Sequence, residues 1–90
     1  MKVHIAGHLR DYMSGAVEVE VGRVSDVEQL IEKLDARFPK FKDRILDEHG
    51  ETRQYINIFV NEDNSRDLDG ERTKLKDEDV IYILPNVAGG

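Results

Sequence analysis

The chain ends in two glycines, Gly89-Gly90, and a carboxylate, and this end has the clearest potential for chemistry in the sequence. Gly90 has no Cβ, so an attacking group can approach its carbonyl carbon without steric hindrance. The residues before the glycines, Val87 and Ala88, are uncharged and not bulky. A carboxylate on such a narrow arm can enter a confined active site on another protein. We therefore expect covalent chemistry at the carboxylate of Gly90.

Residues 85–90 are predicted to form an extended, flexible arm after a globular body that covers residues 1–84. Pro85 follows the strand-like segment 80–84. Because proline has no N–H to donate, we expect the sheet ladder to stop there. Fully extended, the arm would reach roughly 20 Å at about 3.3 Å per residue. Glycine-containing ends are often simply disordered, so this one gains meaning only from the fold that carries it.

The composition indicates a small, acidic globular domain. The 90 residues are 39% hydrophobic and include no cysteine, which excludes a disulfide, a thiol nucleophile and a Cys-based zinc site. A net charge of −6 argues against nucleic acid or an anionic membrane as a partner. It favours a partner with a basic docking surface. No apolar segment approaches the roughly 20 residues of a membrane span, and the N-terminus lacks a signal-peptide core, so we expect a cytoplasmic protein.

Two antiparallel strands are predicted at the N-terminus. Residues 2–7 alternate polar and apolar side chains, and residues 16–21 do the same, with Val17, Val19 and Val21 on one face. The polar segment 8–15 between them is predicted to be a hairpin loop.

A helix is predicted next. Ser25 and Glu28 have the spacing of a capping box with Ser25 as the N-cap, and Pro39 should end the helix at or before residue 38. Apolar residues at helical spacing indicate one face turned to a core: Val27, Leu30, Ile31, Leu34 and Phe38. The same spacing in Phe41, Ile45 and Leu46 predicts a further short helix.

The second half of the chain is predicted to be mostly strands and turns. Residues 55–60 are the most strand-like segment, with Ile56, Ile58 and Val60 on one face. A short edge strand is predicted at 66–68 and a final strand at 80–84. Polar turns separate these segments, at 49–52, 61–65, 69–70 and 76–79.

This order of elements predicts a single domain over residues 1–90 with an α+β, β-grasp (ubiquitin-like) fold. In such a fold, one mixed sheet of four to five strands packs on one main helix. The first and last strands should lie side by side and parallel at its centre, because the connection between them is long enough for a crossover.

Strand alternation also predicts an exposed apolar patch. If Ile58 and Ile83 face the helix, then Phe59, Tyr82 and Leu84 face outward, and we expect Phe59 and Leu84 to lie close together. Single exposed apolar residues are ordinary, but a cluster of them indicates a binding surface.

No metal site is predicted. The three histidines, His4, His8 and His49, have no regular ligand spacing and are expected at or near the surface. The acidic segment 62–70 lacks the residue spacing of a calcium loop and is predicted to be a solvated turn.

The chain resembles the MoaD/ThiS family of ubiquitin-like sulfur carriers. The resemblance rests on Val60-Asn61 at a strand end, on the turn Leu75–Val80, and on the tail Pro85-Asn86-Val87-Ala88-Gly89-Gly90, which matches the pattern P-x-V-[SA]-G-G. Glu78 departs from the glycine usual in that turn. The tail looks closest to CysO-like and stand-alone MoaD-like members.

The resemblance implies a protein cosubstrate rather than an enzyme. An E1-like adenylating enzyme of MoeB/ThiF type would use ATP to adenylate the Gly90 carboxylate, and a sulfur donor would convert it to a thiocarboxylate. An acceptor enzyme, of the molybdopterin synthase large-subunit or cysteine synthase type, would take the sulfur. The chain would need no cofactor of its own. Its arm would consist of Pro85, Val87, Ala88 and Gly89, and its partner-binding patch of Phe59, Tyr82 and Leu84.

Two other functions are compatible with the sequence. The first is a ubiquitin-like modifier, joined through Gly90 to lysines of target proteins. The second is a β-grasp interaction module with an inert tail. For a carrier, the resemblance leaves the acceptor open among a molybdopterin precursor, a cysteine precursor, a thiazole and tRNA.

Overall fold

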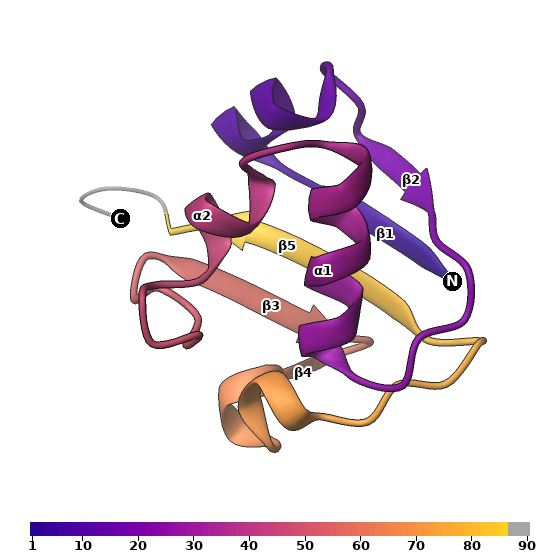
Figure 1. Cartoon of the computed structure of the whole chain (residues 1–90). Coiled ribbons are helices and arrows are strands. Elements are labelled where there is room, and N and C mark those ends of the chain that lie inside the picture. The colour runs from indigo at the N-terminus through magenta and orange to yellow at the C-terminus, as the bar shows by residue number, and fades with distance from the viewer. Residues whose placement is uncertain (87–90) are drawn as a thin grey trace.

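In a computed structural model of the chain, five strands form one mixed sheet, and helix α1 crosses one face of it (Figure 1). The strand order is β2-β1-β5-β3-β4. The central strands β1 and β5 are parallel and the other neighbours are antiparallel. The strands are β1 (Lys2–Ile5), β2 (Glu18–Glu20), β3 (Ile56–Val60), β4 (Asp63–Asn64) and β5 (Val80–Pro85). The predicted β-grasp fold is confirmed.

The structure describes residues 1–86. The predictions for Val87, Ala88, Gly89 and Gly90, including their flexibility, lie outside the described residues. None of the helices in residues 1–86 combines the length and the apolar character needed to cross a membrane.

The core lies between the sheet and α1 (Val27–Arg37). The predicted apolar face is confirmed, because Val27, Leu30, Ile31 and Leu34 are fully buried, and Phe38 packs partly buried at the C-cap. Fully burying one such side chain stabilises the fold by about 1.5–3 kcal/mol. The short helix α2 (Phe41–Ile45), also predicted, adds Phe41 and Ile45 to the same core.

The helix cap differs from the prediction by one residue. Asp26, not Ser25, is the N-cap of α1, and its carboxylate accepts the N–H of Gln29 at 2.8 Å. The side chain of Gln29 in turn accepts the N–H of Ser25 at 2.7 Å. This reciprocal pair of hydrogen bonds resembles a capping box. It forms here because Asp is as good an N-cap residue as Ser, and because Gln can take the place of Glu.

The predicted hairpin loop at 8–15 is wrong. Residues Gly7–Met13 form the 3₁₀ helix η1, which buries Leu9 and Met13 in the core. These two apolar residues stand among polar neighbours, so the segment has no long helical pattern. The strand after it is correspondingly shorter than predicted, and Val17, which precedes β2, is 56% exposed while Val19 and Val21 are buried.

The predicted edge strand at 66–68 is also wrong. The edge strand is β4, and the 3₁₀ helix η2 (Ser65–Asp67) follows it. The side chain of Asn64 caps η2 by accepting the N–H of Arg66 at 3.0 Å. Such local side-chain bonding to the backbone competes with strand formation.

The end of β5 corrects the predicted boundary of the folded body. Pro85 belongs to the strand and lies opposite Ile56, and Asn86 continues the pairing by donating its N–H to the carbonyl of Tyr55 at 2.7 Å. Successive N–H groups of a strand point to alternate sides. The N–H of Asn86 points toward β3, so the backbone nitrogen of Pro85, which carries no hydrogen, points toward β1. Strand β1 has already ended at Ile5, so the proline removes no ladder bond.

Acid should weaken the fold through Glu71. Its carboxylate accepts the N–H and the hydroxyl of Thr52, at 2.8 and 2.7 Å. Burial alone would raise the pKa of Glu71, but these hydrogen bonds outweigh it and the pKa lies below its usual range. A lowered pKa in the folded state stabilises the fold above the unfolded pKa of about 4.3, and this contribution is lost as the pH falls through the folded value.

We therefore expect Glu71→Gln to unfold more easily than the parent chain at pH 7 and to lose less stability on acidification. Urea unfolding of both proteins across the acid range measures this. Glu62→Gln, at an exposed position after β3, is the control and should behave like the parent. Equal acid sensitivity of Glu71→Gln and the parent would contradict the assignment.

Candidate functional site

The three residues predicted to bind a partner lie on the sheet face away from α1. Burial alternates along β3 and β5, so that the isoleucines face the core while Phe59, Tyr82 and Leu84 lie on the other face. Tyr82 is 38% exposed, and Phe59 and Leu84 are partly buried. The outward placement agrees with the prediction, and the binding role stays a prediction.

The strand register shows how these residues are arranged. Phe59 pairs directly with Tyr82, whereas Leu84 lies opposite Asn57. Direct cross-strand neighbours on one face are about 5 Å apart and diagonal ones about 7–8 Å. Phe59 therefore has Tyr82 as its direct neighbour and Leu84 as a diagonal one, a looser contact than the sequence suggested.

His4 extends this patch and was not predicted to do so. It pairs with Tyr82 across the parallel strands, and the two rings stack with centroids 4.9 Å apart and planes 13° from parallel. Its Nδ1 lies 3.6 Å from a carboxylate oxygen of Glu18. One row of side chains, which we call the outer-face row, thus crosses all five strands: Glu18, His4, Tyr82, Phe59 and Asn64.

Asparagine side chains hold the point where the tail leaves the sheet. In addition to the backbone bond to Tyr55, the side chain of Asn86 donates to the carbonyl of Gln54 at 3.2 Å. Its amide oxygen accepts a hydrogen bond from the side chain of Asn57. Three bonds therefore fix Asn86, which was predicted to belong to the flexible arm.

Asn57 connects this point to the far edge of the sheet. Its amide oxygen accepts from Asn64 at 3.1 Å and from the guanidinium of Arg66 at 2.9 Å. The same guanidinium also donates to the carbonyl of Arg53 at 2.6 Å. We call Asn57, Asn64, Arg66 and Asn86 the asparagine network. No pattern in the sequence marks it, because its members come from β3, from the consecutive elements β4 and η2, and from the residue after β5.

Gly7 lies against the last strand residue. It has φ +64°, and a Cβ at this position would come within 2.9 Å of Cγ of Pro85. Glycine is favoured here both by the backbone conformation and by the close approach. The turn after β1 and the base of the tail therefore share one tightly filled space.

No cluster of three or more histidine and acidic side chains within residues 1–86 could hold a metal ion.

We expect Asn57→Ala to loosen the base of the tail. The variant removes three side-chain hydrogen bonds and should lower the free energy of unfolding by about 1–3 kcal/mol. It should also speed hydrogen exchange at the amide of Asn86, measured by NMR. Asn57→Asp is the matched variant that separates the two halves of the network. Its carboxylate can still accept a hydrogen bond from Arg66 but cannot donate one to Asn86. Unchanged exchange at Asn86 in both variants would show that the network does not hold the tail.

The fold and the site define a ubiquitin-like β-grasp protein with an exposed sheet face beside its C-terminal strand. The sequence model of the ThiS family matches residues 3–90, and the chain belongs to this family.

Among curated relatives, the sulfur carrier protein CysO of Mycobacterium tuberculosis is 35% identical over 63 residues, which are 68% of each chain. Among solved structures, a chain of the Amycolatopsis orientalis BexX/CysO complex is similar with a TM-score of 0.90 and 32% identity, over 99% of this chain and 98% of that one. Small archaeal modifier protein 1 of Methanosarcina acetivorans is similar with a TM-score of 0.81 and 36% identity, over 99% and 94% of the two chains.

Proposed function

We propose that this chain is a sulfur carrier protein whose Gly90 carboxylate is adenylated and then converted to a thiocarboxylate. The observation that carries the proposal is that the match to the ThiS family extends to residue 90 and so includes the Gly89-Gly90 tail. The relatives named as sulfur carriers support it, and so does the anchored base of the tail at Asn86. In this function the chain is a carrier and not an enzyme.

The proposed chemistry needs only the carboxylate from this chain. A carboxylate oxygen of Gly90 attacks the α-phosphorus of ATP on the activating enzyme, and pyrophosphate leaves. A sulfide-level sulfur nucleophile then attacks the carbonyl carbon of the acyl-adenylate, and AMP leaves. The net change is replacement of one carboxylate oxygen by sulfur. Gly89 and Gly90 leave this carbon open to attack from either side.

The partners of the proposed cycle are an E1-like adenylating enzyme of MoeB/ThiF type and a sulfur-acceptor enzyme. The similarity to proteins named CysO supports an acceptor of cysteine synthase type over the molybdopterin synthase large subunit. Phe59, Tyr82 and Leu84 are proposed as the contact with these partners, and Pro85, Val87 and Ala88 as the arm that enters their active sites.

The test is the intact mass of the protein after reaction with its cognate activating enzyme, ATP and a sulfide source. We expect a mass gain equal to the exchange of one oxygen for sulfur. The variant that lacks Gly90 should show no gain, because its new terminus is one residue short of the activated position. An unchanged mass of the full chain, with an enzyme shown to be active, would rule out the carrier function.

The alternative is a protein modifier joined through Gly90 to lysines. The similarity to small archaeal modifier protein 1 favours this second candidate. Both functions begin with the same adenylate, so lysine adducts found by mass spectrometry in the host would identify conjugation. If instead the tail is inert and the domain is an interaction module, deleting Gly89 and Gly90 would leave its function intact.

We expect the double variant Phe59→Ala/Tyr82→Ala to raise the KM of activation about tenfold or more, because truncation of central interface aromatics costs 1 kcal/mol or more each. Circular dichroism should show an unchanged fold. Leu68→Ala, which truncates an exposed apolar residue outside the outer-face row, is the control and should leave the KM unchanged. Equal KM values for all three proteins would exclude the patch as a docking surface.

A further inference from the structure

A hollow of about 360 Å³ lies beside the base of the tail. Its walls come from η1, from the turn before α2, from α2 and from the segment before β3, and they consist of Tyr12, Lys40, Asp43, Arg44, Arg53 and Tyr55. The carbonyl of Tyr55 accepts the N–H of Asn86 at 2.7 Å, so the hollow adjoins the point where the tail leaves the sheet. It is separate from the outer-face row, which belongs to the other face of the sheet.

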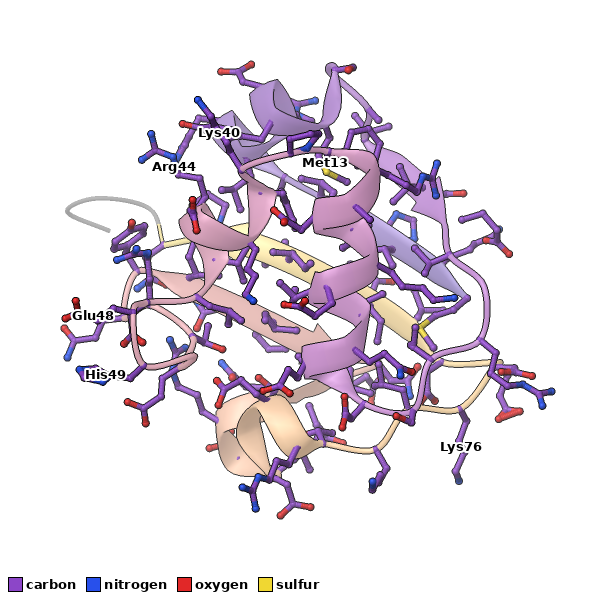
Figure 2. All side chains as sticks on the ribbon, in the orientation of Figure 1. Met13, Lys40, Arg44, Glu48, His49 and Lys76 are labelled. Atoms are coloured by element: carbon purple, nitrogen blue, oxygen red, sulfur yellow. The ribbon has the colours of Figure 1, made fainter. Side chains whose placement is uncertain are left out.

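The hollow is positively charged although the chain carries a net charge of −6. Lys40, Arg44 and Arg53 line it, against one carboxylate, Asp43. Within residues 1–86, none of the three cations lies within 4.0 Å of a carboxylate oxygen. Lys40 and Arg44 lie close to each other at this end of the molecule (Figure 2).

Other contacts hold Arg44 and Arg53 in place without neutralising them. The guanidinium of Arg44 lies 4.9 Å from the ring centroid of Tyr12, a cation–π contact. Nε of Arg53 donates to the carbonyl of Asp43 at 3.0 Å. The backbone of Lys40 is left-handed, with φ 79°. The charge of Arg53 also acts on Asp47, whose pKa is lowered mainly by the N–H of Glu51 and to a smaller degree by Arg53. The least compensated charges are therefore those of Lys40 and Arg44.

This arrangement fits an acidic peptide segment. Its carboxylates would meet Lys40 and Arg44, and its apolar atoms would pack on the ring of Tyr55, which is 47% exposed. An enzyme that closes over the tail must come close to Asn86, and therefore to this hollow. Because the rest of the chain is acidic, the hollow would also orient an acidic partner toward the tail during encounter.

We propose, on the basis of the function proposed above, that this hollow binds an acidic segment of the activating enzyme. The activation assay tests it with the double variant Lys40→Glu/Arg44→Glu. The matched control is Lys74→Glu/Lys76→Glu, which makes the same change in net charge at two exposed lysines, with Lys76 far from the hollow (Figure 2).

We expect the KM of Lys40→Glu/Arg44→Glu to rise about tenfold or more with little change in kcat, since the contact would serve binding rather than chemistry. The KM of the parent should rise with ionic strength more steeply than that of the variant. The KM of the control should stay within about twofold of the KM of the parent, because general charge repulsion is screened by salt over about 10 Å. The neutral pair Lys40→Gln/Arg44→Gln should be intermediate and guards against a folding defect in the charge-reversed protein.

One result would overturn the inference and leave the carrier function standing. It is a parent chain that gains sulfur normally while Lys40→Glu/Arg44→Glu and Lys40→Gln/Arg44→Gln both show the KM of the parent. If the parent chain gains no sulfur with an active enzyme, the carrier function fails and this inference fails with it.

Discussion

The parallel pairing of β1 with β5 is the interaction on which the rest of the structure depends. Val3 and Ile5 pair with Ile81 and Ile83, and all four side chains are buried. Because parallel neighbours cannot be joined by a hairpin, the chain between them must cross over, and it places α1 on one face of the sheet. The pairing ends with the N–H of Ala6 on the carbonyl of Ile83, which sets the position of the residues that lead into the tail.

The base of the tail lies between two surfaces of different chemistry. On the sheet face away from α1 is the outer-face row, with aromatic rings at its centre and carboxylate or amide groups at its ends. On the other side is the hollow that carries Lys40 and Arg44. Asn86 is bonded to residues just before and within β3, so it holds a defined position between the two.

Local patterns predicted much of the fold but little of the site. The alternation in β3 and β5, the apolar face of α1 and the turn before β5 could be predicted because each depends on residues a few positions apart. Leu9 and Met13 are too isolated among polar residues to indicate η1. The stacking of His4 on Tyr82 and the hydrogen bond from Asn57 to Asn86 depend on strand register, which joins residues 78 and 29 positions apart. The hollow likewise depends on how η1 and α2 pack, which no short segment encodes.

The placement of Pro85 also bears on how copies of this protein behave toward one another. Beyond Ile5, the β1 side of strand β5 has no neighbouring strand, and the turn at Gly7 packs against Pro85 there. An open strand edge with free N–H groups can recruit a strand from another molecule and begin aggregation. Proline at this position offers no donor on that edge. The residue that begins the tail pattern thus also offers no hydrogen-bond donor to a strand of another molecule at the exit of the tail.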